Sequence, residues 1–535
     1  MTAQSFKYLF CSICLFSLQV NAFITTWNPA GNQHTIQTST TTRNNQFPDV
    51  TPTLINQPIR STATRLFESA SLMDLLDTLE DKRDIPSLQD WAVEQGVHFA
   101  EGVLLVDNGL GDWGVGLSAN HSHVANTPIM TIPPHLILSS QDARIAPATQ
   151  SFIENKMATI SPGMDYYHKE CLLMMVVLLE TFNAASSNWS PWLETLPRSF
   201  SIGLFLDPLE RSHVGRMAPA FLEQQDKQWN ACWNAIQQVV DDELVELPIG
   251  FRDYLRNYMM NEKSSSSSSS EEETADDERT LKELVQWAFG VVFTRSWRSP
   301  DGKAATLVPL GDMFNHDSSM ANVFPSLLQQ NDDDDESLAA KMPEGSIQMK
   351  LKQNVEVGSP LFISYGMGDQ PARFLVNFGF WDRSASLMDA NLTVPNTEDW
   401  IVDPSELVVS TRSGGVSEEV WNLAAYKFLL LNEQNAMTAT KLAQARKDND
   451  QASFQAILDD YDIPAIMYLR KHALQIISET YPDMDLCPEG NPIESPRRFG
   501  MIARYNNGMR ESWMRVAESL EFELEDALAK RQEGR

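Results

Sequence analysis

The chain has 535 residues, enough for two or three domains with a sizeable core. Hydrophobic residues make up 42% of it and charged residues 21%, which are ordinary proportions for a globular protein. Acidic residues outnumber basic residues by 72 to 41, so the formal net charge is −31 at pH 7. This charge argues against a nucleic-acid-binding protein, which needs a basic face, and favours a basic protein segment as partner.

The cysteines show no pattern typical of a metal site or a disulfide framework. Cys11 and Cys14 have the spacing of metal ligands, but they lie in an apolar N-terminal stretch that we expect to be removed. Cys171, Cys232 and Cys487 are far apart and have no CxxC partner. We therefore predict neither a zinc cluster nor disulfides, and we interpret the later cysteines as small core residues.

Residues 1–22 are predicted to be a signal peptide. Lys7 precedes an apolar run from Tyr8 to Phe16, and Val20-Asn21-Ala22 supplies the small residues of a cleavage site. The apolar run is too short to cross a bilayer as a stop-transfer helix. We therefore expect no stable membrane insertion from this segment.

Residues 23–66 have the composition of a transit peptide. They are rich in Thr, Asn and Gln, and Asp49 is the single acidic residue among them. Behind a signal peptide, the Ala22-Phe23 junction resembles the bipartite plastid presequences of diatoms and related algae. We therefore expect delivery to the plastid (chloroplast). The alternative is the secretory and endomembrane route, with residues 23–66 as a spacer.

Residues 67–385 are predicted to form a β-rich domain with a large helical insertion. A helix is expected at 86–97. Short apolar runs punctuated by glycine and proline predict strands at 103–106, 115–117, 129–132, 347–351 and 361–364. Apolar residues recur every three or four positions in the insertion, from about 141 to 286, and predict helices there. Two acidic loops, 264–278 and 331–336, are interpreted as solvated segments.

Residues 386–535 are predicted to form a separate helical domain, so the fold class is α+β with an all-α domain at the end. Apolar faces with helical spacing include Trp421, Phe428 and Trp513, which we expect to be core residues. Glu418 and Glu419 are expected to be exposed.

Three segments carry residues that could perform chemistry. The first, Trp113-Gly114-Val115-Gly116-Leu117, places a GxG between short strands but lacks the longer fingerprint of a dinucleotide site. A GxG is usually a tight turn. Glycine also lets backbone approach a ligand where a Cβ would collide, so both interpretations stay open.

The second segment, Val308–Asp317, ends an apolar run with the pair Asn315-His316. No second His or Cys lies at metal spacing, so a metal site is the least favoured interpretation and a structural turn remains open. The third segment, Leu361–Gly366, ends a predicted strand at Tyr365 and is followed by Phe374–Phe380. A tyrosine at a strand end is by default a half-buried packing residue.

In this order (GxG, DxxNH, then SYG and a GF segment), the motifs resemble those of the SET-domain methyltransferases. The helical insertion and the helical C-terminal domain resemble the subclass that includes Rubisco large-subunit lysine methyltransferase, whose C-terminal domain binds substrate. Trp287–Ser296, with Arg295, resembles the arginine-bearing segment of that subclass. The resemblance extends from about residue 86 to residue 530. It implies a protein methyltransferase that uses S-adenosyl-L-methionine, with no metal.

The resemblance also implies roles for individual residues. The residues expected to bind the cofactor are Trp113, Gly114, Val115, Gly116, Arg295, Asn315 and His316. Tyr365 would be the catalytic residue, in the channel where the methyl group meets the acceptor, and Asp312 would lie near the target side chain. Phe378 stands where the family has a tyrosine whose hydroxyl can restrict the acceptor pocket. It therefore bears on the acceptor and on the number of methyl groups transferred.

The implied substrate is a lysine of a non-histone plastid protein, such as the Rubisco large subunit or another plastid enzyme. The sequence has no Cys-rich zinc segment beside these motifs, which argues against a typical histone enzyme. Two alternatives remain: a protein-histidine methyltransferase, because the subclass contains such enzymes, and a catalytically inactive SET-fold binding module.

Overall fold

The computed structural model describes most of the chain beyond the predicted presequence. The described residues are 84–107, 113–160, 167–197, 199–215, 218–264, 281–299, 302–328, 342–366, 370–382, 385–392, 400, 402–403, 406–431, 433–480 and 496–533. They all belong to the second of two compact units, Met1–Thr78 and Leu79–Arg535. The predicted presequence and, apart from Ser264, the two predicted acidic loops lie outside the described residues.

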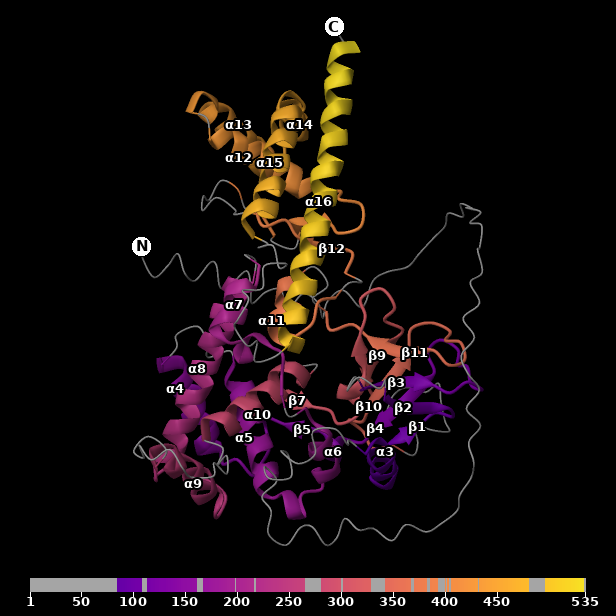
Figure 1. Cartoon of the computed structure of the whole chain (residues 1–535), viewed down its shortest axis with the longest axis vertical. Helices are drawn as coiled ribbons and strands as arrows, with labels where there is room; N and C mark the ends of the chain where they lie inside the picture. Colours follow the sequence, from indigo (N-terminus) through magenta and orange to yellow (C-terminus); the bar gives the residue numbers. More distant parts are fainter. Residues whose placement is uncertain are drawn as a thin grey trace. The chain divides into compact units, whose positions relative to one another are not determined.

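The sheet that carries the predicted motifs has four strands in the order β2-β3-β11-β8. Its strands are β2 (Val103–Asp107), β3 (Trp113–Leu117), β11 (Pro360–Ile363) and β8 (Asn315–His316). β8 runs parallel to β11, and the other two pairs are antiparallel. Strands from an early segment thus lie beside strands from a segment some 200 residues later, which Figure 1 shows as violet beside orange.

Two further sheets complete the β-rich part. The first has the order β1-β4-β10-β9, with β1 (His98–Phe99), β4 (Pro128–Ile132), β10 (Ile347–Leu351) and β9 (Val323–Leu327). The second has the order β5-β7-β6, with β5 (Leu138–Ser139), β7 (Ala305–Leu307) and β6 (Trp297–Arg298). All five predicted strands are present, within one or two residues of their expected ends.

The helix α3 (Ile85–Glu94) precedes these strands. It begins where the sequence favours a helix start, because the Asp84 carboxylate accepts from the Ser87 N–H at 3.1 Å and Pro86 lies in the first turn. The predicted insertion is helical, and its helices are α4 (Pro147–Ile160), α5 (His168–Phe182), α6 (Ser190–Thr195), α7 (Pro208–His213), α8 (Pro219–Asp241), α9 (Phe251–Ser264) and α10 (Leu281–Arg295). Short 3-10 helices occur at Pro134–Leu136, Ala184–Ser186, Gly203–Phe205, Gly311–Met313 and Glu433–Asn435.

α5 is the central helix of the insertion. Its apolar run from Cys171 to Leu179 is buried throughout, as expected of a helix that is apolar on every side. Glu170 and Glu180, which bound this run, are also buried, and each pairs with an arginine: Arg298 and Arg144, respectively. Pairing with arginine compensates the cost of burying a carboxylate. Among the described residues, no helix has both the length and the apolar character needed to cross a membrane.

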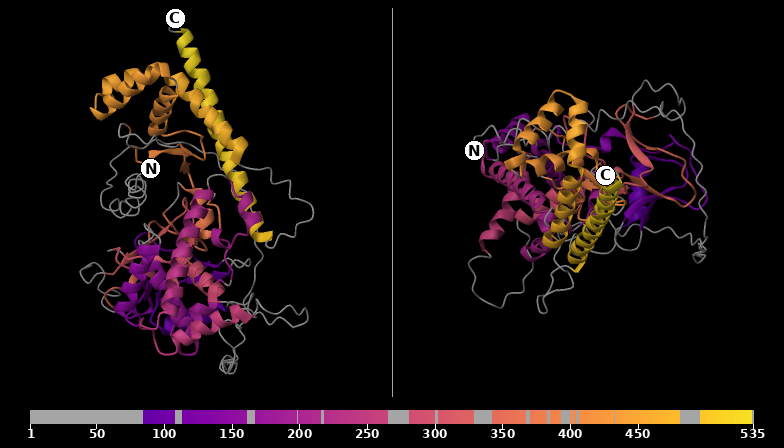
Figure 2. Two further views of the ribbon diagram at one scale, coloured as in Figure 1. Left: turned by 90° about the vertical axis from the view of Figure 1, so that its left-hand side faces the viewer. Right: turned by 90° about the horizontal axis from the view of Figure 1, so that it is seen from above.

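The C-terminal region is helical apart from one small sheet. Its helices are α12 (Glu418–Leu430), α13 (Ala436–Lys447), α14 (Gln451–Asp460), α15 (Asp462–Thr480) and α16 (Pro496–Glu533). Figures 1 and 2 show α16 running beside α15 in every view. The sheet, β12 (Leu387–Asp389) with β13 (Val408–Ser410), was not predicted, because three-residue strands are too short to show alternation.

One hydrophobic core joins the C-terminal helices to the helical insertion and to α11. It includes Trp513 of α16, Leu222 of α8, and Leu375 of α11 (Pro371–Phe378). Polar contacts also fix the first half of α16. Asn506 donates from Nδ2 to the His213 carbonyl at 2.7 Å, and Arg498 pairs with the buried Glu210 at 3.1 Å. The start of α16 is therefore anchored to α7.

Two expectations for side chains in this region have different outcomes. Trp513 is buried and Trp421 packs against the same core, as predicted. The prediction for Glu419 was wrong: its side chain is only 13% exposed and pairs with Arg446 at 2.7 Å. Periodicity could not show this pair, because Arg446 lies on the next helix. Glu418 is exposed, as expected.

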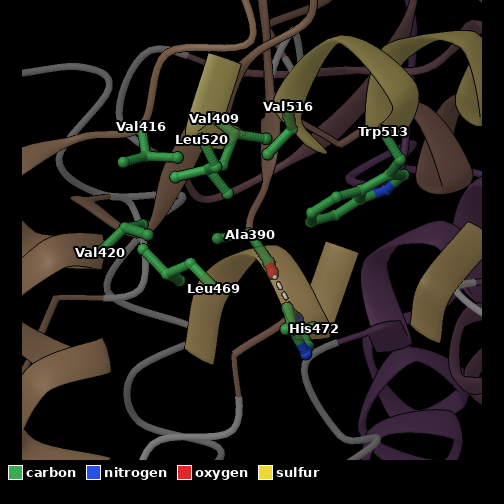
Figure 3. Close-up of a pocket in the computed structure, with 9 residues that line it drawn as sticks. All are labelled: Ala390, Val409, Val416, Val420, Leu469, His472, Trp513, Val516 and Leu520. Carbon is green, nitrogen blue, oxygen red and sulfur yellow. Dashed lines mark hydrogen bonds between the residues drawn. The ribbon is translucent and has the colours of Figure 1, made fainter. Parts of the chain in front are cut away.

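A small cavity lies within the C-terminal core. Figure 3 shows its lining, which is mainly aliphatic and includes Trp513 and His472. His472 contacts the Ala390 carbonyl, with 3.2 Å between Nε2 and O. The volume is about 10 Å³, which barely equals the space of one water. The cavity is therefore a packing defect and contains none of the predicted site residues.

Candidate active site

The sheet with the strand order β2-β3-β11-β8 brings the three predicted motifs together. β11 pairs on one side with β3, so that Leu361 lies opposite Val115, and on the other side with β8, so that Ile363 lies opposite His316. Tyr365 follows two residues after Ile363. The GxG, the Asn-His pair and the strand-end tyrosine thus occupy adjacent strands or their ends, although they are far apart in sequence.

Asn315 connects the first two motifs directly. Its Nδ2 donates a hydrogen bond to the Trp113 carbonyl at 2.6 Å. A Cβ on Gly114 would lie 2.9 Å from the same Nδ2, closer than real Cβ contacts allow. Gly114 is therefore required for the close approach of Asn315 to the backbone of β3. The interpretation of this GxG as merely a tight turn is not supported, because both glycines lie within a strand.

His316 is held on both sides of its ring. Nδ1 accepts a hydrogen bond from the Tyr365 backbone N–H at 3.0 Å, and Nε2 lies 2.8 Å from Oδ2 of Asp382. A backbone amide can only donate, so Nδ1 is unprotonated and Nε2 carries the proton that is donated to Asp382. The side chains of His316 and Asp382 are 1% and 4% exposed. Ser318 also donates to the Asp382 carboxylate.

Tyr365 lies in a cluster of aromatic rings. Its ring centroid is 5.0 Å from those of His316 and Phe378, and Phe374 and Phe380 complete the cluster. The Tyr365 hydroxyl donates to the Phe314 carbonyl at 3.1 Å. Tyr365 and Phe378 are half-buried, so the cluster is apolar but reaches the surface. Such surroundings disfavour charged groups.

Arg295 and Asp312 form an ion pair just before the Asn-His segment, because Asp312 lies three residues ahead of Asn315. Nη1 of Arg295 is 3.0 Å from Oδ2 of Asp312 and 3.2 Å from its backbone carbonyl. Trp192 of α6 also donates to this carboxylate, at 3.3 Å. The Asp312 side chain is fully buried. Burial raises the pKa of its carboxyl group above the ordinary value, and the guanidinium of Arg295 partly opposes this shift.

The segment that leads to Asn315 contains an unusual backbone conformation. Leu310, two residues before Asp312, is fully buried and has a φ of 69°, a backbone conformation that non-glycine residues rarely adopt. Asp312 was expected near the target side chain. Its contacts are with Arg295 and Trp192, so the structure supports a role in holding Arg295, and its part in substrate binding stays a prediction.

The structure therefore brings together the sequence-predicted residues Trp113, Gly114, Val115, Gly116, Asn315, His316, Tyr365 and Phe378 on one sheet and the adjoining helix end. Arg295 and Asp312 adjoin them as a pair. Sequence reasoning missed Asp382 and Trp192, and it included Phe374 and Phe380 only as part of the third segment, with no role of their own. The one available signal for Asp382 was an acidic residue shortly after the GF segment. Among the described residues, no group of three or more His, Cys, Asp or Glu side chains could hold a metal ion.

No family model matches the chain. Among curated proteins, it is similar to the chloroplastic [fructose-bisphosphate aldolase]-lysine N-methyltransferase of Arabidopsis thaliana, with 19% identity over 61% of this chain and 58% of that protein. It is also similar to the actin-histidine N-methyltransferases of Mus musculus and Homo sapiens, with 24% and 23% identity over 57% of this chain and 44% of those proteins. The chain thus spans about half the length of the curated relatives it matches.

Among solved structures, that of Rubisco LSMT bound to sinefungin and monomethyllysine matches with a TM-score of 0.50 and 13% identity. The match covers 83% of this chain and 92% of that one. At this identity the likeness establishes the fold: the chain has the mixed α and β fold of the SET-domain methyltransferases. The matching structure is of Rubisco LSMT, the group that the motifs of this chain resemble.

Proposed function

We propose that the protein is an S-adenosylmethionine-dependent protein-lysine N-methyltransferase. The observation that carries the proposal is the joining of three distant segments by β11, which places Tyr365 and Asn315 around one buried histidine. The SET-domain fold and the methyltransferase names of the curated relatives support the same reaction. The strongly acidic chain favours a protein substrate over nucleic acid.

The residues present fit S-adenosylmethionine. Gly114 leaves room for the amide of Asn315 against the backbone of β3. Nε of Arg295 is buried and makes no hydrogen bond within the described part of the chain, so the guanidinium keeps a donor for a carboxylate in addition to its bond with Asp312. The backbone of residues 113–116, together with Arg295, Asn315 and His316, would hold the cofactor. When bound, the cofactor supplies an electrophilic methyl group on a positively charged sulfur.

The chain's own residues would prepare the acceptor nitrogen. A free lysine has a pKa of about 10.4, so removing its proton at pH 7 costs about 4–5 kcal/mol. The aromatic cluster of Tyr365, Phe378 and Phe380 would lower that cost by disfavouring the charged amine. The Tyr365 hydroxyl directs its proton to the Phe314 carbonyl, and its oxygen can accept from the acceptor N–H. This contact would align the nitrogen for in-line displacement.

Lysine is proposed as the acceptor because the motif set resembles the lysine enzymes. Histidine is the second candidate, because the actin-histidine methyltransferases match over a similar share of the chain. Phe378 lacks the hydroxyl that the family tyrosine would place beside the acceptor. The acceptor residue, lysine or histidine, and the number of methyl groups transferred therefore need a direct measurement. We also propose that Asp312 lies near the target side chain. The substrate would be a non-histone plastid protein, such as the Rubisco large subunit.

The test is incubation of the purified chain with methyl-labelled S-adenosylmethionine and plastid extract, followed by mass spectrometry of the labelled protein. Label on a lysine nitrogen supports the proposal, and label on an imidazole nitrogen assigns the histidine alternative. Cofactor binding by calorimetry without any labelled protein would instead indicate the inactive binding module. Asn315→Ala is the control, because it should abolish both cofactor binding and label.

Plastid location is proposed from residues 1–66 and is supported by the chloroplastic relative. A fluorescent reporter carrying these residues should enter the plastid, whereas the Phe23→Ala version should stay in the secretory route. A reporter that reaches neither compartment contradicts the proposed presequence.

A further inference from the structure

Asp382 lies where the site meets the C-terminal region. α11 ends at Phe378, and Gly379, in the left-handed conformation, turns the chain there. Trp381 and Asp382 lie three and four residues after Phe378. The Asp382 carboxylate meets Nε2 of His316 at 2.8 Å, and Trp381 packs against the C-terminal hydrophobic core. Two consecutive residues thus contact the site on one side and the C-terminal helices on the other.

The contact between Asp382 and His316 determines which nitrogen of the ring is protonated. Asp382 is a buried acceptor, so the imidazole proton is held on Nε2. Nδ1 is consequently free of a proton and accepts the Tyr365 N–H at 3.0 Å. Without the carboxylate, the hydroxyl of Ser318, 3.1 Å from Nε2, would be the acceptor that the described residues leave for this proton, and the ring could turn or protonate at Nδ1. Either change would break the bond that fixes the backbone of Tyr365.

Trp381 is seated against the backbone of α16. A Cβ on Gly508 would lie 1.6 Å from Cη2 of Trp381 and 2.0 Å from its Cζ3. No side chain can therefore be accommodated at position 508 while Trp381 keeps its place. The neighbouring Asn506 and Arg498 anchor this part of α16 to α7, so the surface that receives Trp381 is fixed at several points.

We propose that Asp382 is a positioning residue for Tyr365. We also propose that α16 fixes the position of Asp382, because Trp381, the residue before it, packs against Gly508 of α16. The inference rests on the proposed methyl transfer only where activity is the readout. It gives the C-terminal region a role in the reaction itself: a displacement of α16 at Gly508 is transmitted through Trp381 and Asp382 to His316 and so to Tyr365.

The first experiment compares Asp382→Leu, which removes the acceptor at similar size, with Asp382→Asn, which keeps an acceptor oxygen. In the full chain we expect kcat, counted per cofactor-binding molecule, to fall about thirtyfold in the Leu variant and less than about fivefold in the Asn variant. Nitrogen NMR of labelled histidine gives a readout independent of activity. The His316 signal, assigned with His316→Gln, should show protonated Nε2 in the parent and lose this tautomer in Asp382→Leu.

The second experiment tests the link to α16 with two glycines of the same helix. Gly508→Ala should lower kcat about tenfold or more, although alanine is the better helix former. Gly500→Ala is the matched control, because a Cβ there meets nothing within 4 Å, and its kcat should stay unchanged. Adding Trp381→Phe to Gly508→Ala should restore part of the activity, because a smaller ring relieves the collision.

The outcomes separate the two proposals. If the parent binds cofactor but transfers no methyl group, the proposed function fails, and the His316 tautomer in the parent and in Asp382→Leu still decides the positioning role. If Asp382→Leu keeps both the parent tautomer and the parent kcat per binding site, Asp382 is a structural residue only. Equal effects of Gly508→Ala and Gly500→Ala would remove the link to α16.

Discussion

The side-chain amide of Asn315 donates to the backbone carbonyl of Trp113, with 2.6 Å between Nδ2 and O. This bond crosses 202 residues of sequence and is possible because Gly114 has no Cβ in its path. The register of β11 with β3 and β8 brings the two residues to this distance. The GxG therefore acts together with the Asn-His pair and not as an independent loop.

Gly114→Ala should weaken S-adenosylmethionine binding about tenfold or more, because its Cβ must displace the Asn315 amide. Calorimetry on the full chain measures the dissociation constant. Gly500→Ala, which adds a Cβ in open space on α16, is the control and should bind as the parent does. Parent-like affinity in Gly114→Ala would show that the Asn315 contact does not shape the cofactor site.

Tyr365→Phe should lower the rate of methyl transfer by tens-fold, equal to a barrier increase of about 2 kcal/mol, with cofactor affinity nearly unchanged. The hydroxyl is expected to act on the acceptor nitrogen, and its loss leaves the aromatic ring in the cluster. Single-turnover kinetics with labelled cofactor separates the chemical step from binding. Equal turnover in parent and variant would exclude Tyr365 from catalysis.

Asp312→Asn should not lower the free energy of unfolding at pH 7, because the amide keeps an oxygen that can accept from Arg295 and Trp192, whereas burial disfavours the carboxylate of the parent. Denaturant unfolding of both proteins measures the difference in the free energy of unfolding.

The same pair of proteins tests the pH dependence. Burial raises the pKa of Asp312, so the folded state favours its protonated form. The resulting stability is fully present below the unfolded pKa of about 3.9 and is lost as pH rises through the higher folded pKa. The free energy of unfolding of the parent, relative to that of Asp312→Asn, should therefore fall as pH rises from about 4 to 7. A relative rise over this range would mean that Arg295 lowers the pKa of Asp312 overall.

Charge reversal on the C-terminal helices should weaken transfer to a folded protein substrate and leave transfer to a short peptide unchanged. Glu525 is suited to this test, because it is exposed on α16. Glu419 is not suited, because its pairing with Arg446 makes it structural.

Glu525→Lys is compared with Glu94→Lys, an equal charge change at an exposed position of α3. Surface changes of this kind usually alter stability by less than about 0.5 kcal/mol. Equal responses of protein and peptide would mean that this surface does not dock the substrate.

Local pattern in the sequence determined the element types. Strand positions such as 129–132 and the helical spacing of the insertion were predictable, because alternation and the helical period act over a few residues. The order of the motifs was also enough to indicate the SET-domain class. β8, with only Asn315 and His316, is too short to carry a periodic signal, so its pairing with β11 was not predictable.

Tertiary structure alone decided the partners of the site residues. The pairs His316–Asp382 and Arg295–Asp312, and the packing of Trp381 on Gly508, each join different elements. Sequence spacing carries no information about such contacts, because they depend on which strands pair and which helices pack together. A buried carboxylate such as Asp382 is stable only when that packing supplies donors, so its role appears only once the chain has folded.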